Sequence, residues 1–285
     1  VFRMLSKPCP PERLIKVLND GLEQYDLIRS KRILLDQTLR GAVDALAESL
    51  STAKPLFFGR VQRVRRMANE LAMKQDVPNA WRVDVASVFS QLAYLALPEN
   101  VTEDVYYRRD LSKEVKSLLA KFPEDTRNIL NKIPGLEEVG EILKSVDVQY
   151  RFEEEKEDGV RLAASILKVA LDFDYYEEQG YNRSIIVSTL KERNKDYDPK
   201  ITQSLSDLIV IAEETSTLQE IKIDDIDIGM RLSQELRLDD GFLIAAAGTD
   251  VDRQLLKVIR NYNSCYAESP FPKRIQVIVP VNLLK

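Results

Sequence analysis

The chain has 285 residues, of which 44% are hydrophobic and 31% charged, a composition typical of a folded globular protein with a sizeable core. A net charge of −5 argues against nucleic acid or an anionic membrane as the main partner. The chain contains no histidine, which excludes Ser-His-Asp and Cys-His nucleophiles and metal sites built on imidazole.

The first fifty residues predict a short strand followed by one long helix. Residues 1–6 alternate as a strand does, and the prolines of the next five residues end it. From Glu12 to Leu50, apolar residues recur at helical spacing. Written as heptads, the helix places Tyr25, Leu39 and Leu46 on one seam position, which Arg32 interrupts. The other seam position holds Ile28, Leu35 and Ala42. A dimer seam and a single amphipathic helix both remain open.

Residues 51–218 are mostly helical in pattern, after a linker or helix boundary predicted at 51–55. The apolar stretch Val88–Pro98 predicts a helix that is buried on nearly all sides and stopped by its proline. Within this stretch, Ser90 and Gln91 are neighbouring polar side chains. They indicate either a hydrogen-bonded pair in the core or a small polar cavity.

An earlier helix of this region carries three arginines on one face, at Arg60, Arg63 and Arg66. Such a face can bind phosphate, but a solvated surface is the more economical interpretation. The sequence therefore predicts that these arginines are exposed to solvent.

The composition changes after residue 218, where strand signals replace helical ones. Residues 221–228 are rich in isoleucine, and Met230–Leu238 alternates like one strand. Asp239-Asp-Gly241 is a strong hairpin signal before a returning strand at 242–247. A helix at 251–262 and a strand at 275–281 complete a small α/β element.

The order of these parts resembles a bacterial response regulator whose output module is a degenerate domain of the HD or HD-GYP type. Val1–Pro8 resembles the last strand and Lys-Pro turn of a receiver domain, and the long helix resembles the receiver's final helix extended into a linker. The resemblance implies a mainly α fold, with a long helix, an HD-like helical bundle and a small α/β element containing a β-hairpin. The implied domains are 1–50, 51–218 and 219–285.

The metal-binding positions of that family have lost their ligands here. The implied vestigial positions are Arg60, Ser90, Gln91, Phe122, Val146, Asp147 and Leu171. Arg60 replaces a histidine, Ser90-Gln91 replaces the His-Asp pair, and Leu171 replaces an aspartate. Only Asp147 keeps a side chain that binds metal, and one carboxylate does not hold a dinuclear centre. The resemblance therefore implies a scaffold with no metal, no cofactor and no catalysis.

The leading hypothesis is a two-component signalling protein that acts by protein–protein contact. The resemblance implies an upstream sensor histidine kinase acting through the receiver, and protein partners that include a second copy of the chain if the seam is real. Two widely separated cysteines, with no signal peptide and no apolar run long enough to span a bilayer, predict a cytoplasmic protein.

A second hypothesis is a receptor that binds a cyclic dinucleotide such as cyclic di-GMP without cleaving it. In that case Arg60, Arg63 and Arg66 would meet phosphates and Tyr94 would stack on a base. The same chemistry is available from Arg108, Arg109, Tyr106 and Tyr107. A divergent phosphodiesterase with replacement ligands is the third alternative.

Overall fold

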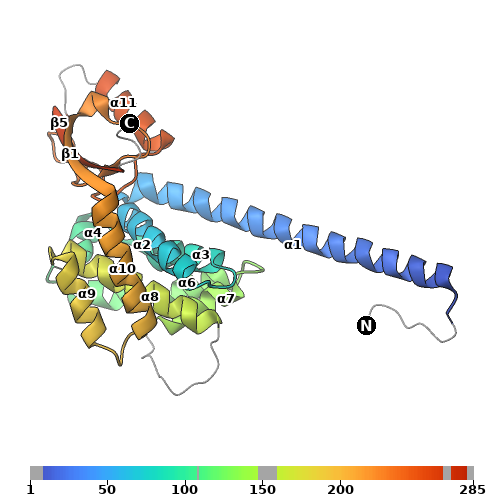
Figure 1. Cartoon of the computed structure of the whole chain (residues 1–285). Coiled ribbons are helices and arrows are strands. Elements are labelled where there is room, and N and C mark those ends of the chain that lie inside the picture. The colour runs from blue at the N-terminus through green and yellow to red at the C-terminus, as the bar shows by residue number, and fades with distance from the viewer. Residues whose placement is uncertain (1–8, 108, 147–158, 266–270, 281–285) are drawn as a thin grey trace. The chain divides into compact units, whose positions relative to one another are not determined.

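The structure is a computed structural model that describes residues 9–107, 109–146, 159–265 and 271–280 (Figure 1). It is mainly helical with small antiparallel sheets near the C-terminus, which confirms the predicted fold class. No helix among the described residues is long and apolar enough to cross a membrane. The α-helices before the sheets are α1 (Pro11–Ala53), α2 (Pro55–Lys74), α3 (Trp81–Leu92), α4 (Glu99–Tyr106), α5 (Lys113–Leu119), α6 (Phe122–Leu130), α7 (Glu137–Ser145), α8 (Gly159–Glu178), α9 (Arg183–Glu192) and α10 (Pro199–Thr215).

The chain divides into two units, residues 1–46 and 47–285. The long predicted helix is confirmed as α1, which has 43 residues and continues beyond the first unit. Of the two alternatives predicted at 51–55, the helix boundary is confirmed, because α1 ends at Ala53 and Pro55 opens α2. Proline suits that position, where its missing N–H would have no helical partner. The strand predicted at residues 1–6 lies outside the described residues.

In the second unit, α2 packs against α3 and α8, and these helices supply most of the core. The burial predicted for Val88–Pro98 is confirmed only in part. Its first half and Leu97 are largely buried, residues 93–95 are half-buried, and Ala96 and Pro98 are exposed. The α-helix ends at Leu92, and a 3₁₀ turn continues the stretch over Ala93–Ala96. This arrangement places Ser90 and Gln91 in the middle of the bundle.

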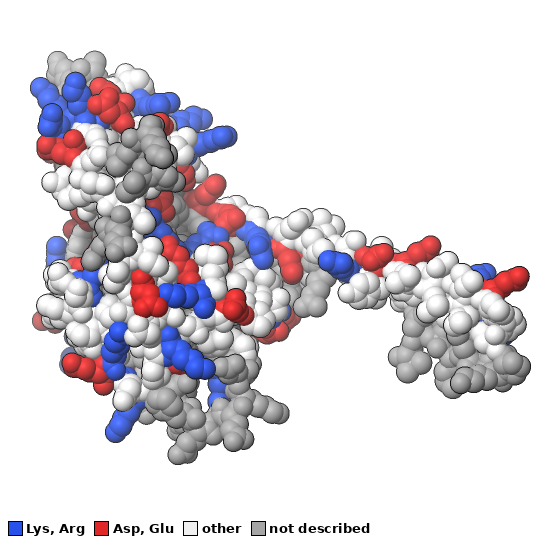
Figure 2. Space-filling view, in the orientation of Figure 1, with Lys and Arg blue, Asp and Glu red and all other residues white. Residues whose placement is uncertain are grey.

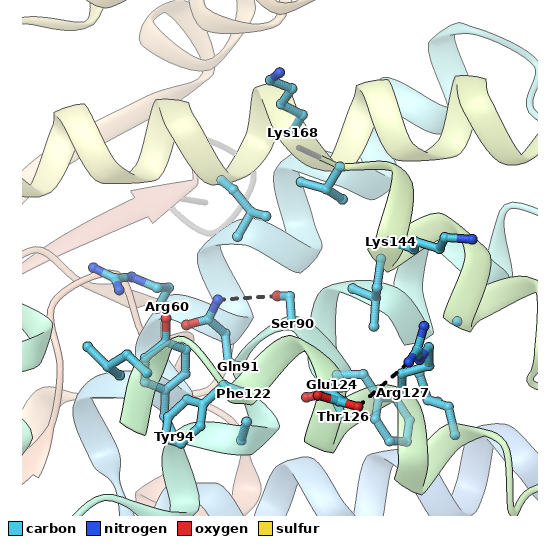
Figure 3. Close-up of a pocket in the computed structure, with 18 of the residues that line it drawn as sticks. Arg60, Ser90, Gln91, Tyr94, Phe122, Glu124, Thr126, Arg127, Lys144 and Lys168 are labelled. Carbon is cyan, nitrogen blue, oxygen red and sulfur yellow. Dashed lines mark hydrogen bonds and ion pairs between the residues drawn. The ribbon is translucent and has the colours of Figure 1, made fainter. Parts of the chain in front are cut away.

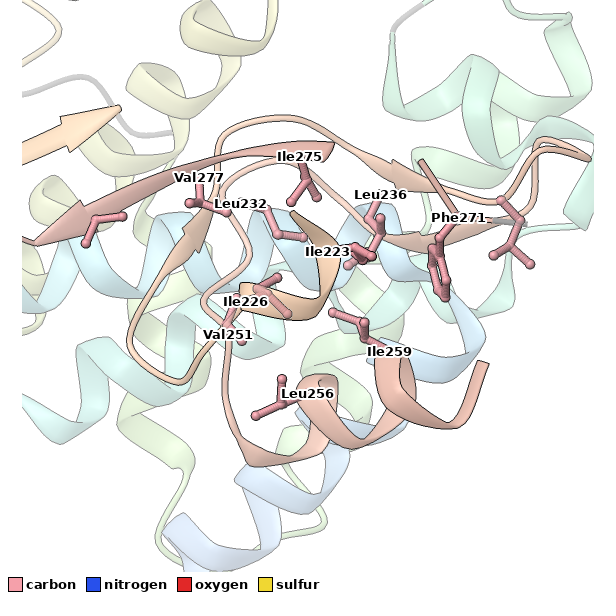
Figure 4. Close-up of a cluster of buried hydrophobic side chains, with 13 residues drawn as sticks. Ile223, Ile226, Leu232, Leu236, Val251, Leu256, Ile259, Phe271, Ile275 and Val277 are labelled. Atoms are coloured by element: carbon pink, nitrogen blue, oxygen red, sulfur yellow. The ribbon is translucent and has the colours of Figure 1, made fainter. Parts of the chain in front are cut away.

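The C-terminal element contains β1 (Ser216–Lys222), β2 (Arg231–Leu232), β3 (Leu236–Arg237), β4 (Leu243–Ala245), α11 (Arg253–Cys265) and β5 (Arg274–Pro280). One antiparallel sheet has the order β1-β5-β2, in which Leu218 pairs with Ile278. The predicted hairpin is confirmed as β3–β4, and Gly241 has the positive φ (+88°) that its turn requires. The strands, α11 and a 3₁₀ turn enclose a separate apolar core around Leu232, Ile259 and Val277 (Figure 4).

The single strand predicted over Met230–Leu238 is wrong. Its first half pairs with β5 and its second half with β4, so the segment contributes to two different sheets. Backbone bonds explain the division, because the N–H of Leu232 donates to the carbonyl of Thr249 and the N–H of Gly248 donates to the carbonyl of Leu232. The loop after β4 thus pairs with β2 and brings residues 246–249 against α2.

Gly59 of α2 lies close against this loop. A Cβ added at Gly59 would lie 2.5 Å from the Cβ of Ala246, closer than such atoms approach. We expect Gly59→Ala to lower the free energy of unfolding by about 1–3 kcal/mol, as overpacking does. Gly140→Ala is the matched control: an added Cβ there meets nothing within 4 Å among the described residues, so α7 should gain about 0.5–1 kcal/mol. Urea unfolding of both variants measures the difference, and equal stabilisation would contradict the close approach.

Candidate functional site

A cavity of about 690 Å³ opens between α2, α3, α6, α7 and α8 (Figure 3). All the vestigial metal-site positions that the structure describes line this one cavity. They are Arg60, Ser90, Gln91, Phe122, Val146 and Leu171. The remaining position, Asp147, lies outside the described residues. Positions from four helices and from the end of α7 therefore meet at a single place, as the resemblance implies.

Ser90 and Gln91 form a hydrogen-bonded pair on the cavity wall, so both sequence interpretations hold in part. The Ser90 hydroxyl donates to the carbonyl of Ser87 at 2.7 Å, and Gln91 Nε2 donates to Ser90 Oγ at 3.2 Å. Gln91 is only 4% exposed. Its Oε1 accepts no hydrogen bond from the described residues. One hydrogen bond thus joins the two side chains, while the amide oxygen of Gln91 has no donor among the described residues.

Arg60 is buried, which contradicts the predicted solvated face. Its Nε donates to Asp174 Oδ2 at 3.0 Å, and its guanidinium carbon lies 4.4 Å from the centre of the Tyr106 ring. Asp174 itself is 3% exposed. The prediction failed because the carboxylate that neutralises Arg60 comes from α8, 114 residues along the chain.

Asp174 also binds Arg63, so one carboxylate pairs with two guanidinium groups. Arg63 Nε donates to Asp174 Oδ1 at 2.5 Å, Nη1 to the carbonyl of Ala247 and Nη2 to the Tyr106 hydroxyl. Glu178 forms a further ion pair with Arg63 at 2.8 Å. Burial alone would lower the pKa of Arg63, but these anionic partners, chiefly Asp174, raise it above the ordinary arginine value. Arg63 therefore stays charged and cross-links α2, α8 and the C-terminal element.

The predicted ligand-binding group does not assemble as one set. Arg60 and Tyr94 line the main cavity, whereas Arg63 and Arg66 line a second cavity of about 290 Å³. Arg66 pairs with Asp250 at 2.7 Å, and burial lowers its pKa despite that partner. The separation is partial, because Arg60 and Arg63 both bind Asp174.

The predicted aromatic residues serve mainly as packing groups. Tyr94 stacks on Phe57 with ring centres 4.3 Å apart and meets the Phe122 ring edge-on. Burial raises the pKa of Tyr106, which lies beneath Arg60. The Tyr107 hydroxyl donates to Glu235, and burial first, then this bond, raises its pKa to about 12. Arg109 pairs with Asp104, and Arg108 lies outside the described residues.

Sequence reasoning missed the charged residues at the cavity margin. They are Glu124, Arg127, Lys144, Lys168 and Asp172. A usable signal existed for Lys168, because residues three apart, such as Lys168 and Leu171, lie on the same face of a helix. Arg127 and Lys144 carried no such signal, since helix packing alone brings α6 and α7 to the cavity.

Comparison with known proteins identifies the fold. The sequence model of the HD domain family matches residues 44–201, more than half of the chain. The chain belongs to the HD domain family. This is the helical fold of metal-dependent phosphohydrolases, and the match covers every helix that lines the main cavity. No curated protein matches the sequence.

The residues of this HD domain do not fit the metal site that the family implies. The chain has no histidine, and the described residues contain no group of three or more Cys, Asp or Glu side chains placed to hold a metal ion. Arg60 puts a guanidinium, which cannot bind a cation, at a position where the resemblance expects a ligand, and it engages the carboxylate of Asp174. Phe122, Val146 and Leu171 line the same cavity with apolar groups. No reaction step can therefore be built on a metal held by these residues.

Proposed function

We propose that this chain is a two-component signalling protein in which the HD domain has lost catalysis and acts through protein–protein contact. The observation that carries the proposal is the Arg60–Asp174 ion pair, in which a guanidinium stands at a position where the resemblance expects a metal ligand. A buried ion pair between α2 and α8 links the same helices that a shared metal would link. The domain thus keeps its helical fold but has lost the catalytic activity.

The beginning of α1 supports the proposed receiver. Leu14, Ile15, Leu18 and Leu22 recur at helical spacing, and each is at least 43% exposed. Apolar stripes of this kind are normally covered by another element. A receiver whose last helix is the first part of α1 would cover them, and a sensor histidine kinase would act on that receiver.

The middle of α1 supports a second copy of the chain as a partner. Tyr25, Ile28, Leu35 and Leu46 of the predicted seam are exposed, and Leu39 is half-buried. On the face drawn in Figure 2, uncharged residues of α1 lie between its acidic and basic ones. We propose that two copies pair through this seam as a coiled coil.

Metal binding tests the loss of catalysis. We expect the purified chain to contain no stoichiometric metal after incubation with Mn²⁺ or Fe²⁺, because the ligands are missing. Its thermal stability should not change with metal, and it should not hydrolyse bis-p-nitrophenyl phosphate or cyclic di-GMP. Asp147→Asn is the control variant: a metal-dependent stabilisation that this change abolishes would locate a metal at the site and contradict the proposal.

Signalling by contact has its own test. The tagged chain, extended by a receiver where the native protein has one, should recover a defined protein from its own cells in a manner that depends on receiver phosphorylation. Recovery of no partner in either state would contradict the proposal.

The size of the main cavity favours a second candidate function, a non-hydrolysing receptor for a small molecule. Ligand pockets usually occupy about 300–1,000 Å³, and this cavity falls in that range at about 690 Å³. Cyclic di-GMP is the ligand that the resemblance suggests. Isothermal titration with cyclic di-GMP tests it, and an absence of heat at high concentration would remove that ligand.

A further inference from the structure

The buried amide of Gln91 is an unsatisfied polar group on the wall of the main cavity. Its Nε2 is used by Ser90, while its Oε1 is buried without a hydrogen-bond donor among the described residues. Buried polar atoms in folded proteins nearly always have a partner, and an unpaired acceptor is costly. An acceptor of this kind, next to a cavity, calls for a donor supplied by a bound molecule.

The cavity wall around Gln91 is aromatic and aliphatic. Tyr94 and Phe122 lie beside it (Figure 3), and Tyr94 is held in place by stacking on Phe57. Leu171 and other aliphatic side chains complete the wall. Flat rings pack well against such surfaces, either offset or edge to face.

The charged residues that line the cavity are already engaged. Arg60 binds Asp174, and Asp172 accepts a hydrogen bond from the Tyr197 hydroxyl at 2.7 Å. Three basic residues at the cavity margin also have partners. Arg127 pairs with Glu124, Lys144 pairs with Glu141, and Lys168 lies over the ring of Tyr197. The Arg127–Glu124 and Lys144–Glu141 pairs are long and exposed, at 4.0 and 3.6 Å, so a ligand phosphate would compete with Glu124 and Glu141 for these cations. An uncharged ligand would leave all of these contacts as they are.

We propose that the cavity binds an uncharged, flat heteroaromatic molecule that donates an N–H hydrogen bond to Oε1 of Gln91. This inference rests on the receptor candidate described above and names the chemistry of its ligand. The N–H satisfies the buried acceptor, and the ring packs against Tyr94 and Phe122. Anionic dinucleotides fit less well, because the cavity offers them no unengaged cation among the described residues.

Matched probes test the donor directly. Isothermal titration would compare indole, which has one N–H donor, with 1-methylindole, which has none. We expect 1-methylindole to bind the wild-type chain roughly tenfold more weakly, the usual effect of one neutral hydrogen bond. Gln91→Met keeps the side-chain length but removes the acceptor, so it should bind both probes equally. Gln203→Met, at an exposed position on α10, is the control and should discriminate as the wild type does.

Three outcomes would overturn the inference. They are no binding of indole to the folded wild-type chain, equal binding of indole and 1-methylindole, and tighter binding of indole-3-acetate or cyclic di-GMP than of indole. Leu171→Trp, which adds a bulky ring to the cavity wall, should weaken indole binding, and unchanged binding would place the probe outside the cavity. If the domain does catalyse a reaction, metal uptake or hydrolysis would show it in a separate experiment. The comparison of indole with 1-methylindole could still be interpreted.

Discussion

Asp174→Asn should lower the free energy of unfolding by about 3–5 kcal/mol, because it leaves two buried guanidinium groups without their shared counter-charge. Arg60 and Arg63 each have side chains only 10% exposed, and Asp174 is 3% exposed. Neither arginine can lose its proton to escape the penalty. Chemical denaturation monitored by circular dichroism measures the effect.

A control and a double-mutant cycle separate the buried network from general loss of charge. Asp207→Asn removes an acid that pairs with Lys74 at the surface, where its side chain is 45% exposed, and should leave the unfolding midpoint nearly unchanged. Arg60→Met should destabilise the wild type more than it destabilises Asp174→Asn, because the pair is already broken there. Equal effects in both backgrounds would show that the two residues are not coupled.

Local pattern predicted several of the elements and, with the resemblance, a set of residues that line the main cavity. Helical spacing predicted α1, and the Asp-Asp-Gly241 turn predicted the hairpin because few residues tolerate its positive φ. The motif positions are fixed to helix faces, so following them along the chain placed Ser90, Phe122 and Leu171 around one cavity. These features depend on spacing within one element.

The other features depend on which helices and strands pack together. The spacing of residues within one element does not say which elements those are. Arg63 looks like a surface residue until α8 brings Asp174 beside it from 111 residues away. The same holds for Leu232 and Leu236, which alternate as one strand but pair with different partners. The sequence predicts that the polar side chain of Gln91 needs a hydrogen-bond partner. It does not predict that Oε1 has none among the described residues.

The proposed dimer seam of α1 has a definite orientation if its charges are considered. In the heptad that puts Tyr25 and Ile28 at the seam, Lys31 and Asp36 occupy the flanking g and e positions. In a parallel pair, g of one helix faces e of the next heptad on its partner, so Lys31 meets Asp36 of the other copy. An antiparallel pair does not bring these residues together. The Lys31–Asp36 pair therefore favours a parallel, two-stranded coil. Arg32 opposes it, because this residue stands at the seam position between Tyr25 and Leu39 and would meet its own copy in a parallel pair.

Leu35→Glu should weaken the dimer about a hundredfold or more, equivalent to about 3 kcal/mol, because it buries a carboxylate in each helix of an apolar seam. Leu34→Glu is the matched control: Leu34 is 65% exposed and Leu35 47%, but Leu34 lies outside the seam. Sedimentation velocity of the full chain over a range of concentrations measures both. A wild-type monomer, or equal effects of the two substitutions, would reject the seam.

Charge reversal then tests the orientation. Lys31→Glu alone should weaken the dimer by placing two acidic residues together, and Lys31→Glu combined with Asp36→Lys should restore it in a parallel coil. In an antiparallel coil these positions do not face each other, so the second change would bring no recovery. Because each exposed pair contributes only about 0.2–1 kcal/mol, the comparison needs low salt, where the difference between the single and double variants is greatest. Recovery that persists undiminished at high salt would show that packing, and not the proposed ion pair, sets the alignment of the helices.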